Sequence, residues 1–237
     1  QNQLFGSLPP SWFWDDKNTD QSWPNTLTSL NLEFNALSGS IPTDIGLATV
    51  LQRINLQQNR LGHTIPTELS ELTELQQILW NDNVLTGSIP ASIFSASSTA
   101  LQAISWNNNQ LTGTLPTELG LLSTSLQEFY VGRNQLQGPL PSEIGRLGAT
   151  LLDLHLYNNQ LTGSIPTEWG GLTSIRWLYL AHNQLTGTLP SELGACTELQ
   201  LFQVEDNLLQ GEIPSEELAN WGIASRVWLY DNSQLSG

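Results

Sequence analysis

The chain has 237 residues and a formal net charge of −15, with 7 basic residues against 22 acidic ones. This balance argues against nucleic acid and anionic membranes as partners, because both select basic surfaces. No apolar run approaches the roughly 20 residues that a membrane-spanning helix needs, so we expect no direct membrane insertion.

A single pattern recurs along almost the whole chain. An Asn is followed seven residues later by a Pro in nine places, from Asn2 and Pro9 to Asn207 and Pro214. Apolar residues stand eight, five and three positions before each of these Asn residues after the first. The unit is L-x-x-L-x-L-x-x-N-x-L-x-G-x-I-P, and it repeats every 24 to 26 residues. A period of this length predicts a stacked-repeat architecture.

The repeats predict one solenoid domain over residues 1–237. A partial repeat at 1–26 carries an insertion at about 11–25, eight full repeats cover 27–224, and a partial repeat covers 225–237. Both ends fall inside repeats and neither shows a capping unit, so we expect a fragment of a longer chain. In the insertion, Trp12 and Trp14 are expected to plug a widened coil, and a docking loop is the alternative.

Each part of the unit has a physical role. The L-x-L alternation predicts a short strand with one buried face, and stacked strands form a parallel sheet. The repeated Asn is expected to satisfy backbone groups of its own coil and the next. Gly four residues after the Asn suits a tight turn, with His63 as an exception. The Pro is expected to open a short helical segment whose first turn carries a carboxylate.

These elements predict an α/β repeat solenoid, an arc with a parallel β-sheet on its concave face. Short helical or 3-10 segments and turns occupy the convex side. The pattern, with its G-x-I/L-P continuation, resembles the plant-type leucine-rich-repeat family of plant and algal receptor ectodomains and wall-associated proteins. The resemblance implies an extracellular or cell-surface location and a protein, peptide or glycan ligand on the concave face.

The chain departs from that family in two respects. Members usually close their ends with paired cysteines, whereas this chain has Cys196 alone, which we interpret as a small buried residue rather than a catalytic thiol. The sequence also has no Asn-x-Ser/Thr acceptor for glycosylation, which departs from many secreted members.

The exposed strand positions change character along the chain. The first four repeats carry mostly amides and small residues there. The next three carry the predicted partner-binding residues Tyr130, Arg133, His155, Tyr157, Arg176, Trp177, Tyr179 and His182. Tyr130, His155 and Tyr179 share one strand position and should stack, and Tyr230 is expected to extend the patch. Aromatic side chains and Arg on an exposed sheet are typical of binding hot spots. Alternatively, cross-strand aromatic pairs merely stabilise the sheet.

Enzymatic activity is not expected, because the sequence has no phosphate-binding glycine loop, no His-Glu-x-x-His pair and no nucleophile elbow. We predict no cofactor and no metal. A column of single carboxylates, one per coil, is explained by helix-start electrostatics. Its members are Asp44, Glu68, Glu118, Glu143, Glu168, Glu192 and Glu216.

Three functions remain open at this point. The favoured one is recognition of a partner by the concave face. The alternative is a structural spacer or assembly component of a cell-surface or wall-associated complex. A minor alternative is ice binding by a column of Thr and Ser, which Gln137 with Pro139 and Gln210 with Glu212 interrupt. The column consists of Thr86, Ser88, Thr112, Thr114, Thr162, Ser164, Thr186 and Thr188.

Overall fold

The computed structural model of the chain describes residues 4–13, 26–95, 97–221 and 226–236. The strands of the longest sheet are β2 (Ser29–Asn31), β4 (Arg53–Asn55), β6 (Gln77–Leu79), β8 (Ala103–Ser105), β10 (Glu128–Tyr130), β12 (Asp153–His155), β14 (Trp177–Tyr179), β16 (Leu201–Gln203) and β18 (Arg226–Trp228). The strands that follow the Asn turns are β1 (Phe5–Gly6), β3 (Ala36–Ser40), β5 (Arg60–Thr64), β7 (Val84–Ser88), β9 (Gln110–Thr112), β11 (Gln137–Pro139), β13 (Gln160–Gly163), β15 (Gln184–Leu185), β17 (Gln210–Glu212) and β19 (Gln234–Ser236). The helices are the 3-10 helices η1 (Pro10–Trp12), η2 (Thr43–Leu47), η3 (Thr67–Glu71), η4 (Ala91–Ile93), η5 (Thr117–Leu122), η6 (Ser142–Leu147), η7 (Thr167–Gly171) and η8 (Ser191–Ala195), followed by the α-helix α1 (Ser215–Leu218).

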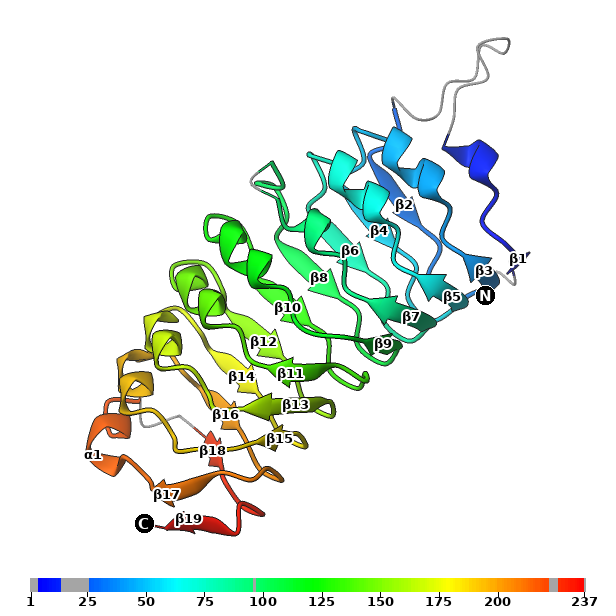
Figure 1. Cartoon of the computed structure of the whole chain (residues 1–237). Helices are drawn as coiled ribbons and strands as arrows, with labels where there is room; N and C mark the ends of the chain where they lie inside the picture. Colours follow the sequence, from blue (N-terminus) through cyan, green and yellow to red (C-terminus); the bar gives the residue numbers. More distant parts are fainter. Residues whose placement is uncertain (1–3, 14–25, 96, 222–225, 237) are drawn as a thin grey trace.

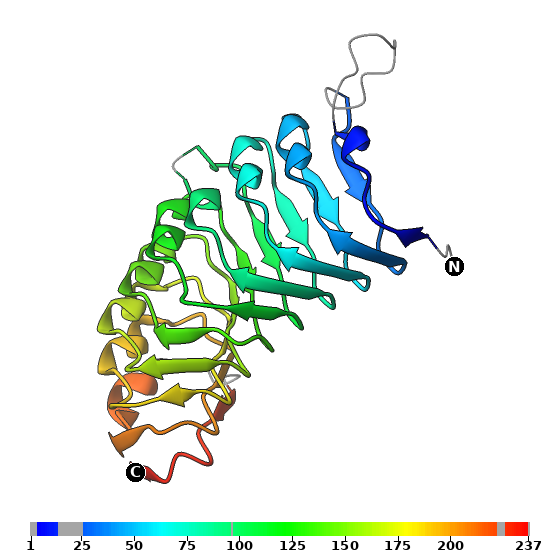
Figure 2. The same ribbon diagram turned by 45° about the vertical axis from the view of Figure 1, so that its right-hand side comes forward.

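The coils follow one another along a curved and twisting row (Figures 1 and 2). Within the described residues, a nine-stranded parallel sheet runs in the order β2-β4-β6-β8-β10-β12-β14-β16-β18. The 3-10 helices line the outer side of the row (Figure 2), and the second strands of the coils pair in shorter parallel sheets. This is the predicted α/β solenoid with its sheet on the concave side.

Alternation along each short strand builds the core. In β12 and just after it, Leu154 and Leu156 are buried, whereas the residue between them faces the concave surface. The equivalent leucines and isoleucines of neighbouring coils join into one continuous apolar cluster. Because burial of each side chain contributes about 1.5–3 kcal/mol, the cluster stabilises the stack whatever the exposed residues are. The residues at the exposed strand positions can therefore vary without loss of the stack.

The repeated Asn forms a hydrogen-bonded ladder along the stack. Asn159 donates from Nδ2 to the carbonyl of Leu156 in its own coil at 3.1 Å and to the carbonyl of Val131 at 3.0 Å. Its Oδ1 accepts from the backbone N–H of Leu136 at 3.0 Å. Val131 and Leu136 belong to the preceding coil, so the expected bonding to the next coil is wrong in direction. The ladder Asn comes directly after the short strand, and its side chain bonds to the backbone of the preceding coil.

Two turn positions in each coil adopt the left-handed region. Gly163 has a φ of +75°, and the exception predicted at His63 adopts +63° with a side chain present. A second position, directly before the ladder Asn, also has positive φ although it is never Gly, as at Arg133 (+53°) and His182 (+55°). This position turns its side chain outward at the edge of the concave sheet, and its occupants vary from coil to coil.

The expectation for the insertion is wrong in part. Phe13, with an exposed fraction of 0%, fills the coil next to η1, whereas Trp12 is 39% exposed. Trp14 lies outside the described residues. The residues from Pro10 to Trp12 are exposed and Phe13, which follows η1, is buried. The aromatic content of the segment alone does not predict which ring enters the core.

Cys196 is buried, as expected. Its Sγ lies 3.5 Å from the carbonyl oxygen of Trp169 in the preceding coil, and burial raises the pKa of the thiol to about 11. A thiol that stays protonated at neutral pH is a poor nucleophile, so the residue acts in packing.

Candidate binding surface on the concave sheet

The strand register confirms the predicted aromatic line across the sheet. Tyr130 of β10 is paired with His155 of β12, and His155 with Tyr179 of β14. The rings of Tyr130 and His155 stack with centroids 4.3 Å apart. Tyr179 meets the other side of His155 edge-on at 4.2 Å. The imidazole is therefore held between two phenol rings.

Tyr157 joins this line from the turn that follows β12. Its ring centroid lies 5.8 Å from that of His155 and 6.3 Å from that of Tyr179. The ring rests on Gly132 of the preceding coil, where an added Cβ would stand 2.6 Å from it. The guanidinium carbon of Arg133 lies 5.9 Å from the centre of the Tyr157 ring. Tyr130, His155, Tyr157 and Tyr179 are named the aromatic cluster below.

Asp153 holds the aromatic cluster from within the sheet. The hydroxyl of Tyr130 donates to Oδ2 of Asp153 at 2.8 Å. Nε2 of His155 lies 2.9 Å from Oδ1 of the same carboxylate, but without hydrogen-bond geometry. Burial raises the pKa of Tyr130, and the hydrogen bond to Asp153 adds to it; burial and the charge of Asp153 raise the pKa of Tyr179. The phenols therefore stay protonated and keep their donors over the physiological pH range.

The remaining predicted residues lie around the aromatic cluster. Trp177 begins β14 opposite Asp153 and is half-buried, and the exposed Arg176 precedes it. In the part of the chain that the structure describes, no ring contact or ion pair joins these two to the aromatic cluster. His182 is exposed at the sheet edge, with Nδ1 2.7 Å from Oδ2 of Asp206. The structure thus brings Tyr130, Arg133, His155, Tyr157 and Tyr179 together, and the other three flank them.

The C-terminal coils carry a second exposed aromatic pair. Trp228 and Tyr230 are 41% and 58% exposed, with ring centroids 6.5 Å apart. Trp228 is paired with Gln203, which is in turn paired with Tyr179, so the pair continues the aromatic line after one interruption. Tyr230 lies at the C-terminal end of this line, where it was expected to extend the patch. Trp228 was not predicted from the sequence. Trp228 stands four residues before the ladder Asn232, as Tyr179 stands before Asn183, and this equivalence requires that Asn232 be recognised as the ladder Asn.

Other kinds of site find no support in the described residues. Within them, no group of three or more His, Cys, Asp or Glu side chains is placed to hold a metal ion. Helix-start carboxylates accept instead from the preceding hydroxyl of their own coil at five described positions, as Glu68 does from the Thr67 hydroxyl at 3.2 Å. None of the helices described is long and apolar enough to cross a bilayer.

A curved stack of short coils, with constant residues inside and variable residues on the concave sheet, defines the class of repeat solenoids. Family models named leucine rich repeat match residues 124–185 and residues 26–47 and 50–72. The chain therefore belongs to the leucine-rich-repeat family, and its repeats are of the plant type.

Solved structures of this family resemble the chain over nearly its whole length. A TDR receptor is 32% identical with a TM-score of 0.82, over 92% of this chain and 36% of that one. The Arabidopsis receptor kinase HAESA, bound to the peptide hormone IDA and a co-receptor, is 33% identical with a TM-score of 0.81, over 90% of this chain and 34% of that one. A plant ice-binding protein is 26% identical with a TM-score of 0.68, over 100% of this chain and 79% of that one.

The chain thus spans about a third of the length of those two receptors. The comparison with curated proteins gives no match.

Proposed function

We propose that the chain is a non-catalytic recognition module that binds an extracellular protein or peptide on its concave sheet. The aromatic cluster carries this proposal. Its four rings are fixed by mutual contacts, by Gly132 and by the hydrogen bond to Asp153, so little side-chain entropy is lost when a partner binds. The rings remain partly exposed, and the hydroxyls of Tyr157 and Tyr179 offer polar contacts beside apolar area.

The likeness to plant receptors supports the partner class and the location. One of them, HAESA, is described in complex with a peptide hormone and a co-receptor, which favours a peptide or protein ligand over a glycan. The extracellular location and the absence of catalysis are proposed on the same basis.

A structural spacer is the competing interpretation, in which the aromatic cluster serves only the sheet. The leucine core is continuous through coils that carry amides at the same positions, such as Asn55 of β4. The sheet therefore forms without aromatic residues on this face, and the spacer interpretation gives no reason for their clustering over three coils.

The test is selection followed by measurement of affinity. A random peptide library is displayed and panned against the intact chain, and the dissociation constants of enriched peptides are measured for the wild type and for Tyr157→Ala/Tyr179→Ala. Truncation of hot-spot aromatic residues typically costs at least about 2 kcal/mol, so we expect a loss of at least about 30-fold. Leu121→Ala, on the exposed side of η5, serves as the control and should leave affinity unchanged. Equal affinities of the wild type and the double variant would refute the assignment.

Ice binding is the second candidate, and the resemblance to the plant ice-binding protein is the observation that favours it. Thr112, Thr114, Thr186 and Thr188 are exposed beside the turn glycines of their coils. Each such Gly also leaves room for the hydroxyl side chain of the preceding coil; a Cβ on Gly113 would stand 3.1 Å from Cβ of Ser88.

Thermal hysteresis of the wild type, compared with Thr112→Leu/Thr186→Leu, tests this second candidate. Activity that disappears in the variant would establish ice binding, and absence of activity in the wild type would exclude it.

A further inference from the structure

Two glutamates occupy the same position in their coils, two residues before the ladder Asn, and their environments differ. Near the N-terminus, the Glu33 carboxylate accepts from Gln57 Nε2 at 2.5 Å, from Asn55 Nδ2 at 2.8 Å and from Asn31 Nδ2 at 3.3 Å. These amide donors, with that of Gln57 first, lower the pKa of Glu33. The carboxylate of Glu33 is thus satisfied by three amide donors.

Glu205, seven coils later, has no amide side-chain donors like those around Glu33 among the described residues. It is only 4% exposed, and its Oε2 is buried with no hydrogen-bond donor among the described residues. Burial raises the pKa of this carboxyl above its usual value. A hydrogen bond from its own backbone N–H opposes this rise in pKa without cancelling it. A buried carboxylate oxygen without a donor, as Oε2 is here, is costly and needs an explanation.

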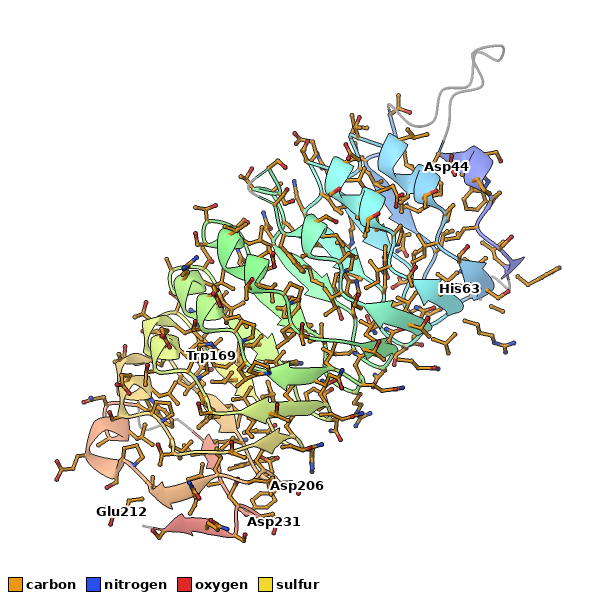
Figure 3. All side chains as sticks on the ribbon, viewed as in Figure 1. Asp44, His63, Trp169, Asp206, Glu212 and Asp231 are labelled. Atoms are coloured by element: carbon orange, nitrogen blue, oxygen red, sulfur yellow. The ribbon has the colours of Figure 1, made fainter. Side chains whose placement is uncertain are left out.

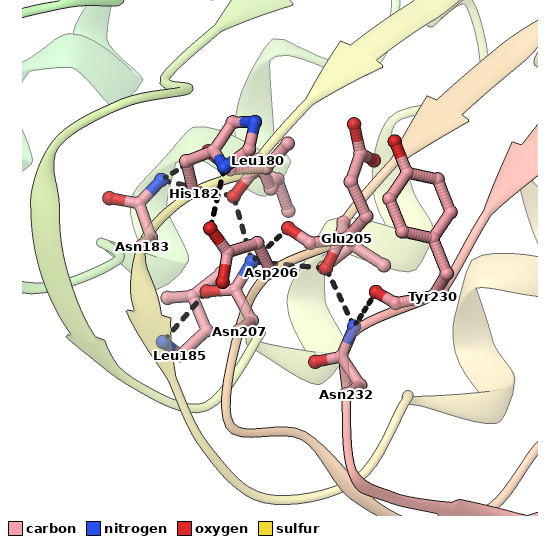
Figure 4. Close-up of polar contacts among 11 residues, drawn as sticks. Leu180, His182, Asn183, Leu185, Glu205, Asp206, Asn207, Tyr230 and Asn232 are labelled. Carbon is pink, nitrogen blue, oxygen red and sulfur yellow. Dashed lines mark hydrogen bonds and ion pairs between the residues drawn. The ribbon is translucent and has the colours of Figure 1, made fainter.

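The surroundings of Glu205 are aromatic and acidic. The Tyr230 ring lies beside the Glu205 side chain (Figure 4), and Trp228 is next to Tyr230 on the same strand end. Desolvation raises the pKa of the Tyr230 phenol, and the charges of Glu205, Asp231 and Asp206 raise it further. Asp206 and Asp231 lie at the same edge of the C-terminal coils (Figure 3). Glu205, Asp206, Asp231, Trp228 and Tyr230 are named the acidic patch below.

Neither of the nearby basic side chains, His182 and Arg226, forms an ion pair with Glu205 among the described residues. His182 has its Nδ1 2.7 Å from Asp206 rather than from Glu205. Arg226 begins β18 two residues before Trp228, and within the described chain no ion pair joins it to Glu205. Oε2 of Glu205 is therefore a buried acceptor that the described residues leave unused.

We propose that the acidic patch binds a cationic side chain, a guanidinium or an ammonium, of the peptide or protein partner, with the Glu205 carboxylate as its acceptor. This rests on the proposed recognition function and specifies the charge of one part of the partner. A guanidinium offers several N–H donors to the carboxylate and stacks on aromatic faces, which suits Trp228 and Tyr230. More than half of the Tyr230 surface is exposed, so its ring can move aside at a small cost in buried area.

An organic cation fits the acidic patch better than a metal ion. Glu205 and Asp206 lie in one coil and Asp231 in the next, and within the described residues no group of three or more such side chains meets the geometry of a metal site. Aromatic rings contribute no hard ligands to an ion such as calcium. The same rings attract a guanidinium through their faces, so the mixed composition of the acidic patch selects the organic cation.

The proposal is tested with the acetylated and amidated tripeptide Gly-Arg-Gly and its counterpart in which citrulline replaces Arg. Citrulline has nearly the same shape and no charge. Binding is followed by NMR, through the indole signal of Trp228 and the backbone amides around Glu205. We expect saturable binding of the Arg peptide with at least tenfold weaker binding of the citrulline peptide. Glu205→Gln should weaken the Arg peptide at least tenfold.

Glu33→Gln is the matched control, since it removes the same charge at the equivalent position, and it should change the affinity less than twofold. The proposal is overturned if Glu205→Gln binds the Arg peptide as the wild type does, if both peptides bind equally, or if the Arg peptide shows no saturable binding. Library-selected peptides that lose affinity in Tyr157→Ala/Tyr179→Ala but keep it in Glu205→Gln would leave the recognition function standing and refute this inference alone.

Discussion

Replacing Asn159 by Asp tests the ladder that fixes the concave face. Nδ2 of Asn159 donates to the carbonyls of Val131, Leu156 and Tyr157 at 3.0, 3.1 and 3.4 Å. In the variant an anionic oxygen would face these carbonyls, while the bond from the Leu136 N–H to Oδ1 is kept. The substitution thus removes the donors and adds repulsion with almost no change in volume.

The magnitude follows from these contacts. Two bonds near 3.0 Å are lost, each worth about 0.5–1.5 kcal/mol net, and leaving the carbonyls without partners adds further cost, for a total of about 2–4 kcal/mol. A protonated Asp regains one donor, so the loss should shrink as the pH falls. The neighbouring Asn158 is exposed with a φ of +53°, a conformation that Asp tolerates, so Asn158→Asp should cost less than about 0.5 kcal/mol.

Urea unfolding followed by far-UV circular dichroism gives the free energy of unfolding of both variants and of the wild type. The two variants carry the same added charge one residue apart, so their difference isolates the ladder contacts. A loss in Asn159→Asp no larger than that in Asn158→Asp would refute the role given to the ladder.

Four further predictions concern single side chains. Because burial raises the pKa of Glu205 above 4.5, its ionised form costs stability above that raised value, so Glu205→Gln should increase Tm at pH 7 and the gain should fade as the pH falls through it. The pKa of Glu33 is lowered, so its ionised form stabilises the fold above pH 4.5, and this stabilisation is lost as the pH falls through the lowered pKa. Glu33→Gln should therefore decrease Tm at pH 7. Tm shifts of the same sign in Glu33→Gln and Glu205→Gln would contradict the difference between the two sites. The Cys196 thiol, buried with a pKa of about 11, should resist iodoacetamide at pH 8 in the native chain and react in urea; rapid native alkylation would contradict its burial. Gly132→Ala should displace the Tyr157 ring, which an added Cβ would approach to 2.6 Å, and should weaken peptide binding about fivefold or more while the circular dichroism spectrum is retained.

The architecture follows from the sequence because its signals are repeated. Each coil presents the same leucines, Asn and Gly, and the parallel pairing of Tyr130, His155 and Tyr179 follows from their equal distance to the ladder Asn. Such positional equivalence needs no knowledge of side-chain geometry. The gathering of an aromatic cluster on three neighbouring strands was therefore predictable.

Features that depend on the reach and burial of individual side chains were not predictable in this way. Spacing does not reveal that Asp153 accepts from Tyr130, nor that Phe13 rather than Trp12 is buried. Glu33 and Glu205 occupy equivalent positions, and only the donors on neighbouring coils make one satisfied and the other unsatisfied. The functional surface is thus located by the repeat, whereas its chemistry is decided by contacts between coils.

Site-specific photo-crosslinking measures most directly whether the concave sheet is the recognition surface. Benzoylphenylalanine is placed at Tyr157 in one variant and at the exposed Leu121 of η5 in another, and each is irradiated with a library-selected peptide. The account predicts crosslinking from position 157, reduced by an excess of unlabelled peptide, and none from position 121. Crosslinking from position 121 alone would contradict the account and move the binding surface to the convex side.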